Sequence, residues 1–202
     1  MSSLVHKKKP FDIFGKATHG KVGMWFFLAT DALAFAGFLI GYQLLRIRIA
    51  DWPTPSEFLG IHLSAFATFL LICSSVTMVI SLAWGETGNR AKMLKYLIFT
   101  ALGGMVFLGI QVYEYQHLFH ASGMSFSDFK YGPPQFASSF FLVTGFHGLH
   151  VFSGVVYLWI MIIQTARGKY DNGKINAVEI CGLFWHFVDL VWILVFTFIY
   201  LL

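Results

Sequence analysis

The chain alternates between long apolar stretches and short polar connectors. Five stretches of mostly apolar residues occupy, approximately, 22–46, 61–84, 96–118, 136–164 and 178–202. An α-helix rises about 1.5 Å per residue, so about 20 residues cross the ~30 Å hydrocarbon layer of a membrane. The connectors, at 51–57, 85–92, 122–134 and 167–174, are rich in turn-forming residues. The pattern predicts an all-α membrane protein: a bundle of five transmembrane helices at 22–202, preceded by an N-terminal tail at 1–21.

The fifth stretch carries ionisable side chains at its centre. Residues 183–199 read LFWHFVDLVWILVFTFI, with His186 and Asp189 three residues apart and therefore on one face of a helix. A charged side chain at the middle of a bilayer costs at least about 2.5–3.5 kcal/mol, so such residues face protein or a polar cavity. We therefore expect this helix to lie within a bundle. Trp185 and Trp192 flank Asp189 at spacings of four and three residues, which indicates core packing or the aromatic flank of a polar site.

Composition and charge support the membrane class. The chain is 57% hydrophobic and 12% charged, and its 14 Lys and Arg lie between the apolar stretches rather than along one solvated face, which argues against nucleic-acid binding. Eleven of them fall in the tail and in the connectors after the second and fourth stretches, and three fall on the opposite side. The positive-inside rule then predicts a cytoplasmic N-terminus and a periplasmic C-terminus. The tail lacks the features of a signal peptide, and we expect it to be retained.

Further polar residues interrupt the other apolar stretches. Asp31 lies nine residues into the first stretch, or ~14 Å along a helix. His147 and His150 share a face of the fourth helix, and Gln111 and Glu114 lie in the outer part of the third. Because these residues come from several helices, we expect a shared polar interior. Each side chain has either a packing role or a functional one, and the sequence leaves both open.

The histidines raise the alternative of haem binding. A haem between transmembrane helices needs one imidazole from each of two helices, and His147 or His150 with His186 could supply them. A second such pair, which a two-haem electron-transfer stack would need, is missing from the sequence. Asp189 also offers His186 a nearby partner. We therefore favour a chain that holds no cofactor of its own.

Other kinds of site find less support. A copper or zinc site would need clustered Cys, Met and His, but the seven Met residues are scattered. Cys73 and Cys181 lie in separate apolar stretches, and we expect both to be small buried apolar side chains. Gly103 and Gly104 lie within a predicted helix, where paired small residues are typical of close helix packing rather than of a phosphate loop.

A proton-coupled transporter is an alternative from another functional class, because transporters also place acids and histidines at mid-depth. Such a protein should have broken helices around a cavity and recurring half-length segments. The five stretches contain no internal proline and no obvious repeat. The sequence therefore favours a bundle whose polar groups satisfy one another.

Several motifs resemble subunit III of the haem–copper terminal oxidases, the cytochrome c oxidase subunit 3 family. They are GMWFFLATDALAF (23–35), Gln111 followed by Glu114-Tyr115, TGFHGLHVFSG (144–154) and LFWHFVDLVW (183–192). The resemblance covers the chain from about residue 20 onward. The pattern of five stretches is similar to the short bacterial form of the family, which lacks the first two of seven helices.

The resemblance implies an accessory, non-redox subunit in a bacterial inner membrane. Haem and copper then belong to partner subunits, and this chain contacts subunit I directly, stabilising it during turnover and supporting proton uptake. Structural phospholipid, subunits II and IV and a respiratory supercomplex are further partners that the resemblance suggests. The electron donor to the complex is cytochrome c in one branch of the family and quinol in another.

The resemblance also assigns candidate residues. Asp31 matches a buried carboxylate that reacts with carbodiimides in relatives, although the mitochondrial type has Glu there, which leaves that reactivity open. Asp31 and Phe184, where the mitochondrial type has Tyr, lean toward the quinol branch, whereas Phe146 before HGLHV leans toward the cytochrome c branch. We favour cytochrome c oxidase, with quinol oxidase as the alternative and an accessory protein of nitric-oxide reductase behind both. The family's intramembrane polar set corresponds here to Glu114, His147, His150, Glu179, His186 and Asp189.

Overall fold

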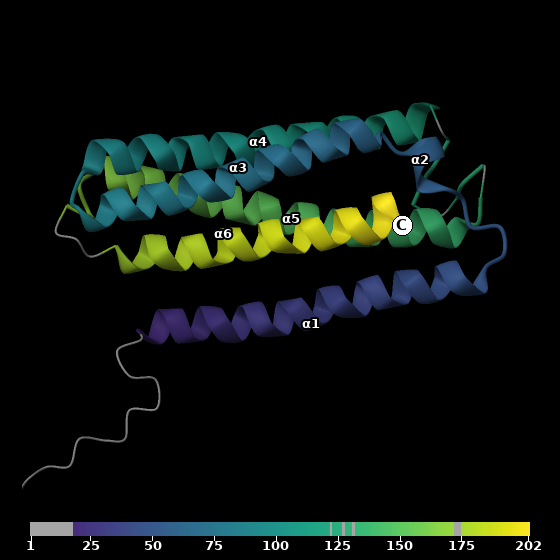
Figure 1. Cartoon of the computed structure of the whole chain (residues 1–202), viewed down its shortest axis with the longest axis horizontal. Coiled ribbons are helices and arrows are strands. Elements are labelled where there is room, and N and C mark those ends of the chain that lie inside the picture. Colours follow the sequence, from purple (N-terminus) through teal and green to yellow (C-terminus); the bar gives the residue numbers. More distant parts are fainter. Residues whose placement is uncertain (1–17, 122, 127, 131, 172–174) are drawn as a thin grey trace, which may run out of the picture.

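The computed structural model describes residues 18–121, 123–126, 128–130, 132–171 and 175–202. Its helices, drawn in Figure 1, are α1 (His19–Arg48), α2 (Pro55–Phe58), α3 (Ile61–Glu86), α4 (Arg90–Ala121), α5 (Pro134–Ala166), α6 (Asn176–Val195) and the π-helix η1 (Phe196–Leu201). Among the described residues, five helical segments are long and apolar enough to cross a membrane, the last being α6 continued by η1. The predicted all-α bundle of five transmembrane helices is confirmed.

The helix boundaries differ from the predicted spans mainly at their ends. α1 begins at His19, within the predicted tail, because Thr18 Oγ1 caps the helix by accepting a hydrogen bond from the backbone N–H of Lys21, 3.4 Å away. The short helix α2 in the 51–57 connector was not predicted; it starts at Pro55, a residue well suited to a first helical position. The change to π geometry after Val195 was not predicted either. Positions 1–17 of the predicted tail lie outside the described residues.

The helices pack around α6. In Figure 1, α3 and α4 form an antiparallel pair, α5 and α6 lie beside it, and α1 runs along the far side of α6. α6 packs against α1, α3 and α5, and it is the most buried of the five spans. α1 packs mainly against α5 and α6, and it is the least buried. Grooves lie open along α1, on one side between α1 and α6 and on the other between α1 and α5.

Close packing at Gly103 and Gly104 confirms the interpretation of this glycine pair. A Cβ on Gly103 would lie 2.8 Å from Cβ of Ser74 on α3. A Cβ on Gly104 would overlap the Trp185 indole of α6, and a Cβ on Gly154 of α5 would lie 2.9 Å from Cε3 of the same ring. The indole thus fits between two helices that only glycine allows to approach so closely.

The prediction that both cysteines are buried is wrong for one of them. Cys181 is buried, but Cys73 is exposed, and both are free thiols. The next residue, Ser74, faces inward and accepts a hydrogen bond from Trp185 Nε1 at 3.1 Å. Successive residues point about 100° apart around an α-helix, so Cys73 faces outward.

Among the residues that the structure describes, most of the basic ones lie at one end of the bundle. The start of α1, the α3–α4 turn and the α5–α6 connection meet at that end, on the left of Figure 1. Lys21 forms an ion pair with Glu179 there, and Arg90 lies near Asp171. The other end receives the last turn of α1, which is also basic. The connectors that the sequence analysis grouped on one side of the membrane therefore do lie at one end of the bundle. Which end faces the cytoplasm stays a prediction.

Candidate functional site

Asp31 and His150 form a polar contact between α1 and α5. Nε2 of His150 lies 3.3 Å from Oδ1 of Asp31, and Nδ1 lies 2.8 Å from the carbonyl oxygen of Phe146. A carbonyl only accepts, so the Nδ1 contact requires a proton on Nδ1, and a neutral ring then leaves Nε2 as an acceptor. The contact with Asp31 therefore needs one further proton, carried by the imidazole or by the carboxyl group. Asp31 and His150 together are a proton-holding pair.

His147 occupies a different environment, although it lies on the same helix. Its side chain is fully buried, stacks on Trp192 at 4.9 Å between ring centroids and meets the ring of Phe107 edge-on at 5.9 Å. Neither ring nitrogen has a hydrogen-bond partner among the described residues. The surroundings of His147 are an aromatic cage, which suits packing and gives the imidazole no evident proton acceptor.

Glu114 of α4 joins α4 to α3 and η1 near the end of the bundle opposite the basic end. Its Oε1 accepts a hydrogen bond from Ser64 of α3 at 3.0 Å, and its Oε2 accepts one from Tyr200 of η1 at 2.8 Å. The wider i→i+5 turn of a π-helix changes the direction in which residues after Val195 face, Tyr200 among them. Gln111, one turn earlier on α4, is also buried, and its Nε2 has no partner among the described residues.

His186 and Asp189 share a face of α6 that is turned toward α3. Nδ1 of His186 lies 2.8 Å from the hydroxyl of Ser75. The hydrogen-bond partner of His186 is therefore this serine and not Asp189, which the sequence had suggested. The same hydroxyl lies beside the carboxyl group of Asp189. Asp189 is 7% exposed, and its Oδ1 has no hydrogen-bond partner in the described part of the chain. These three side chains form a second polar group, between α3 and α6.

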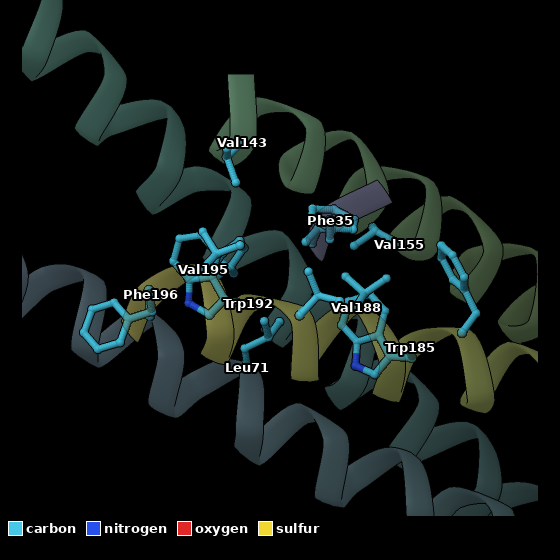
Figure 2. Close-up of a cluster of buried hydrophobic side chains, with 14 of the residues drawn as sticks. Phe35, Leu71, Val143, Val155, Trp185, Val188, Trp192, Val195 and Phe196 are labelled. Atoms are coloured by element: carbon cyan, nitrogen blue, oxygen red, sulfur yellow. The ribbon is translucent and has the colours of Figure 1, made fainter. Parts of the chain in front are cut away.

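Trp185 and Trp192 pack in the core and bond to α3. Trp185 Nε1 donates to Ser74, and Trp192 Nε1 donates to Thr68 at 2.8 Å. Figure 2 shows both indoles within the buried cluster of apolar side chains. Of the two interpretations of this aromatic stripe, the structure supports core packing, with the indole N–H groups anchoring α6 to α3.

Glu179 lies apart from the other candidates. It belongs to the first turn of α6, is half-buried and pairs with Lys21 of α1. Nearby, Thr18 donates a hydrogen bond to the side-chain oxygen of Asn176 at 2.9 Å. These contacts hold the start of α1 against the start of α6, at the basic end of the bundle.

The hydrogen bonds of the described residues join the candidates in separate groups rather than in one network. One group lies between α1 and α5, one between α3 and α6, and one joins α3, α4 and η1. No set of three or more His, Cys, Asp or Glu among the described residues is arranged to hold a metal ion. Sequence reasoning missed the partners on α3, although Ser64, Thr68 and Ser75 recur there at helical spacing, a pattern that could have indicated a polar face.

Comparison with known proteins agrees with the motifs. The family model described as cytochrome c oxidase subunit III matches residues 16–202. The chain is 31% identical over 183 residues to cytochrome c oxidase subunit 3 of Alkalihalophilus pseudofirmus, covering 90% of this chain and 85% of that protein. It is 34% identical over 183 residues to cytochrome bo(3) ubiquinol oxidase subunit 3 of Pseudomonas putida, covering 90% and 84%. The motifs and these matches show that the chain belongs to the cytochrome c oxidase subunit III family of the haem–copper oxidases.

Proposed function

We propose that this chain is the accessory, non-redox subunit III of a proton-pumping cytochrome c oxidase of aerobic respiration. It binds subunit I directly, stabilises it during turnover and supports proton uptake, while haem and copper belong to partner subunits. The observation that carries the proposal is that two acids within the spans are held by the chain's own side chains, Asp31 by His150 and Glu114 by Ser64 and Tyr200. Groups satisfied in this way stabilise a bundle instead of presenting ligands.

Removal of the subunit tests this proposal. An oxidase that assembles without the chain should keep nearly unchanged haem spectra but lose activity progressively during turnover. Activity should be restored when the chain is added back. Loss of the haem signal on removal of this subunit alone would contradict a non-redox role.

The Asp31–His150 pair supports the part of the proposal that concerns protons. A carboxyl group and an imidazole that share one proton near the middle of a span can accept or release that proton without leaving an unpaired charge. Asp31→Asn keeps the size of the side chain but removes the titrating group. We expect the variant to assemble and to show altered proton uptake or a changed rate of inactivation. Unchanged kinetics and unchanged lipid content would leave Asp31 with a packing role.

The groove between α1 and α5 supports the part that concerns phospholipid. It has a volume of about 460 Å³, its walls are almost entirely apolar, and Arg48 lies at its end in the last turn of α1. An acyl chain fits such walls, and a guanidinium at the membrane surface suits a phosphate. We expect Arg48→Gln to lose bound phospholipid in native mass spectrometry. Arg46→Gln, in the same turn but outside the groove, is the matched control.

The proposal also names the electron donor of the complex. We favour cytochrome c on the string in which Phe146 precedes HGLHV. Quinol stays the alternative, because relatives named for both donors match the chain at similar identity. Reduced cytochrome c and ubiquinol should be offered in turn to the purified complex. Oxygen consumption with quinol alone would decide for the alternative.

Localisation and topology complete the proposal. We place the chain in a bacterial inner membrane with its N-terminus in the cytoplasm, together with subunits I, II and IV and a respiratory supercomplex as further partners. The concentration of basic residues at one end of the bundle supports this orientation. In a cysteine-free background, Asp51→Cys should react with an impermeant maleimide in spheroplasts, whereas Lys169→Cys should not. The reverse pattern would contradict the proposed topology.

A further inference from the structure

One outward face of the bundle differs from an ordinary lipid-facing surface. It is the face of α6 that lies between α1 and α3, called here the α6 face, and it includes Leu183, His186, Phe187 and Leu190. Two adjoining grooves, of about 400 Å³ and about 370 Å³, run along it between α1 and α6. Both grooves are lined by Ala32, Phe187 and Leu190, so they form one continuous track.

A polar group with an open hydrogen-bonding site lies midway along this track. His186 is the eleventh residue of the Asn176–Leu201 span, or about 15 Å from its start, near the middle of a ~30 Å hydrocarbon layer. Its Nδ1 is engaged with Ser75, and no described residue pairs with its Nε2. The ring is half-buried and lines the groove. His150 differs from His186 in that both of its ring nitrogens have partners within the chain.

Acyl chains cannot complete this site. A polar atom in hydrocarbon without a hydrogen bond is destabilising, whereas a polar side chain of another helix can supply that bond. Hydrogen-bonding capacity at mid-depth therefore fits a protein neighbour better than a lipid.

The wall that α1 contributes also suits a helix. Ala29, Ala32 and Ala36 are exposed and line the track at helical spacing. Small side chains allow the backbone of a second helix to approach closely, as in many transmembrane helix pairs. The groove between α1 and α5 offers the opposite combination, with apolar walls and a charge only at its end, Arg48, which suits a lipid.

We propose that the α6 face is the surface on which a transmembrane helix of the haem-bearing partner subunit docks. A polar side chain of that helix bonds to Nε2 of His186 midway through the membrane. This inference rests on the proposed function, because it specifies where the chain meets its catalytic partner.

Site-specific photocrosslinking within the intact oxidase tests the face. Benzoylphenylalanine at Leu190, which is 58% exposed on the α6 face, should form an adduct with the haem-bearing subunit, identified by mass spectrometry. The matched control is Val106, which is 49% exposed near the middle of α4, and we expect it to label lipid. Helix α4 lies across the bundle from α1. Adducts of Leu190 with lipid alone or with a haem-free subunit would overturn the proposal. So would adducts of Val106, but not of Leu190, with the haem-bearing subunit.

Substitution of His186 tests the polar contact. His186→Leu removes the hydrogen-bonding site, and we expect the chain to be lost from the detergent-purified complex at least about tenfold more than the unaltered chain. His186→Gln keeps a polar group and should retain most of it. Ser75→Ala removes the same internal hydrogen bond but leaves Nε2, so it should stay bound. Equal loss with Ser75→Ala and His186→Leu would show that the internal fold is responsible, and the proposed contact would be wrong.

The outcomes separate this inference from the function on which it rests. A chain that never copurifies with a haem-bearing subunit would contradict both. A chain that copurifies, with no adduct between Leu190 and that subunit, would contradict only the assignment of the face.

Discussion

Replacing Gly104 of α4 by alanine should destabilise the bundle. The added Cβ would overlap Cη2 of Trp185 and lie 2.8 Å from Cγ2 of Val155. Carbon atoms pack best at about 3.5–4.0 Å, so α4 must move outward or the indole must leave its place. The indole is 1% exposed and bonds to Ser74 through Nε1, so it cannot move without losing that bond.

The magnitude follows from three contributions. Overfilling a packed core costs about 1–3 kcal/mol. Displacement of the indole would add the loss of its hydrogen bond to Ser74, about 0.5–1.5 kcal/mol. The higher helix propensity of alanine opposes these effects by up to about 1 kcal/mol. With the indole displaced, we expect a net loss of about 0.5–4.5 kcal/mol, which is about 2- to 2,000-fold in the unfolding equilibrium.

Gly109→Ala is the matched control. Gly109 lies on the same helix, and a Cβ there meets nothing within 4 Å in the described structure. The change in helix propensity is the same for both substitutions, so their difference isolates the contact with Trp185. We expect Gly109→Ala to be neutral or to stabilise the chain by up to about 1 kcal/mol.

Unfolding of the purified chain in mixed micelles, titrated with sodium dodecyl sulfate and followed by tryptophan fluorescence and circular dichroism, measures the effect. A second variant sharpens the result: Trp185→Phe removes the ring atoms that the new Cβ would meet. The double variant Gly104→Ala/Trp185→Phe should therefore be more stable than the sum of the single effects implies. Equal stability of Gly104→Ala and Gly109→Ala, or strict additivity with Trp185→Phe, would refute the packing argument.

Three further predictions concern other parts of the bundle. Tyr200→Phe removes the donor to Oε2 of Glu114 and should lower the free energy of unfolding by about 1–3 kcal/mol in the same titration. An unchanged midpoint of the titration would contradict the hydrogen bond. In the folded, isolated chain, Cys73 faces the surrounding lipid or detergent near the middle of α3, so the membrane-permeant N-ethylmaleimide should alkylate it slowly but still faster than the buried Cys181; mass spectrometry of tryptic peptides at successive times distinguishes the two. Lys21→Met breaks the partly exposed ion pair with Glu179 and should lower the free energy of unfolding by no more than about 1 kcal/mol in the same titration. A larger decrease would contradict the small contribution expected of an exposed pair.

The number of membrane-spanning helices could be predicted from the sequence because the membrane imposes it. A span must be long enough to cross the hydrocarbon, and its backbone groups must bond within the segment, so five long apolar stretches predict five helices. The motifs around Asp31, His150 and Asp189 indicated the family in the same direct way, since they are strings of adjacent residues. The identity of the polar candidates was likewise visible, because few polar residues interrupt these stretches.

Only the tertiary structure decided which partner each polar residue meets. His186 bonds to Ser75 rather than to Asp189, Glu114 reaches Tyr200 beyond the start of the π-helix, and Cys73 faces outward. A soluble helix reveals its buried side by its apolar stripe. A membrane helix is apolar toward lipid and toward its neighbours alike, so the pattern does not reveal how the helix is rotated about its axis. That rotation depends on close contacts between helices, such as the fit of the Trp185 indole against Gly104, and these contacts exist only once the bundle has packed.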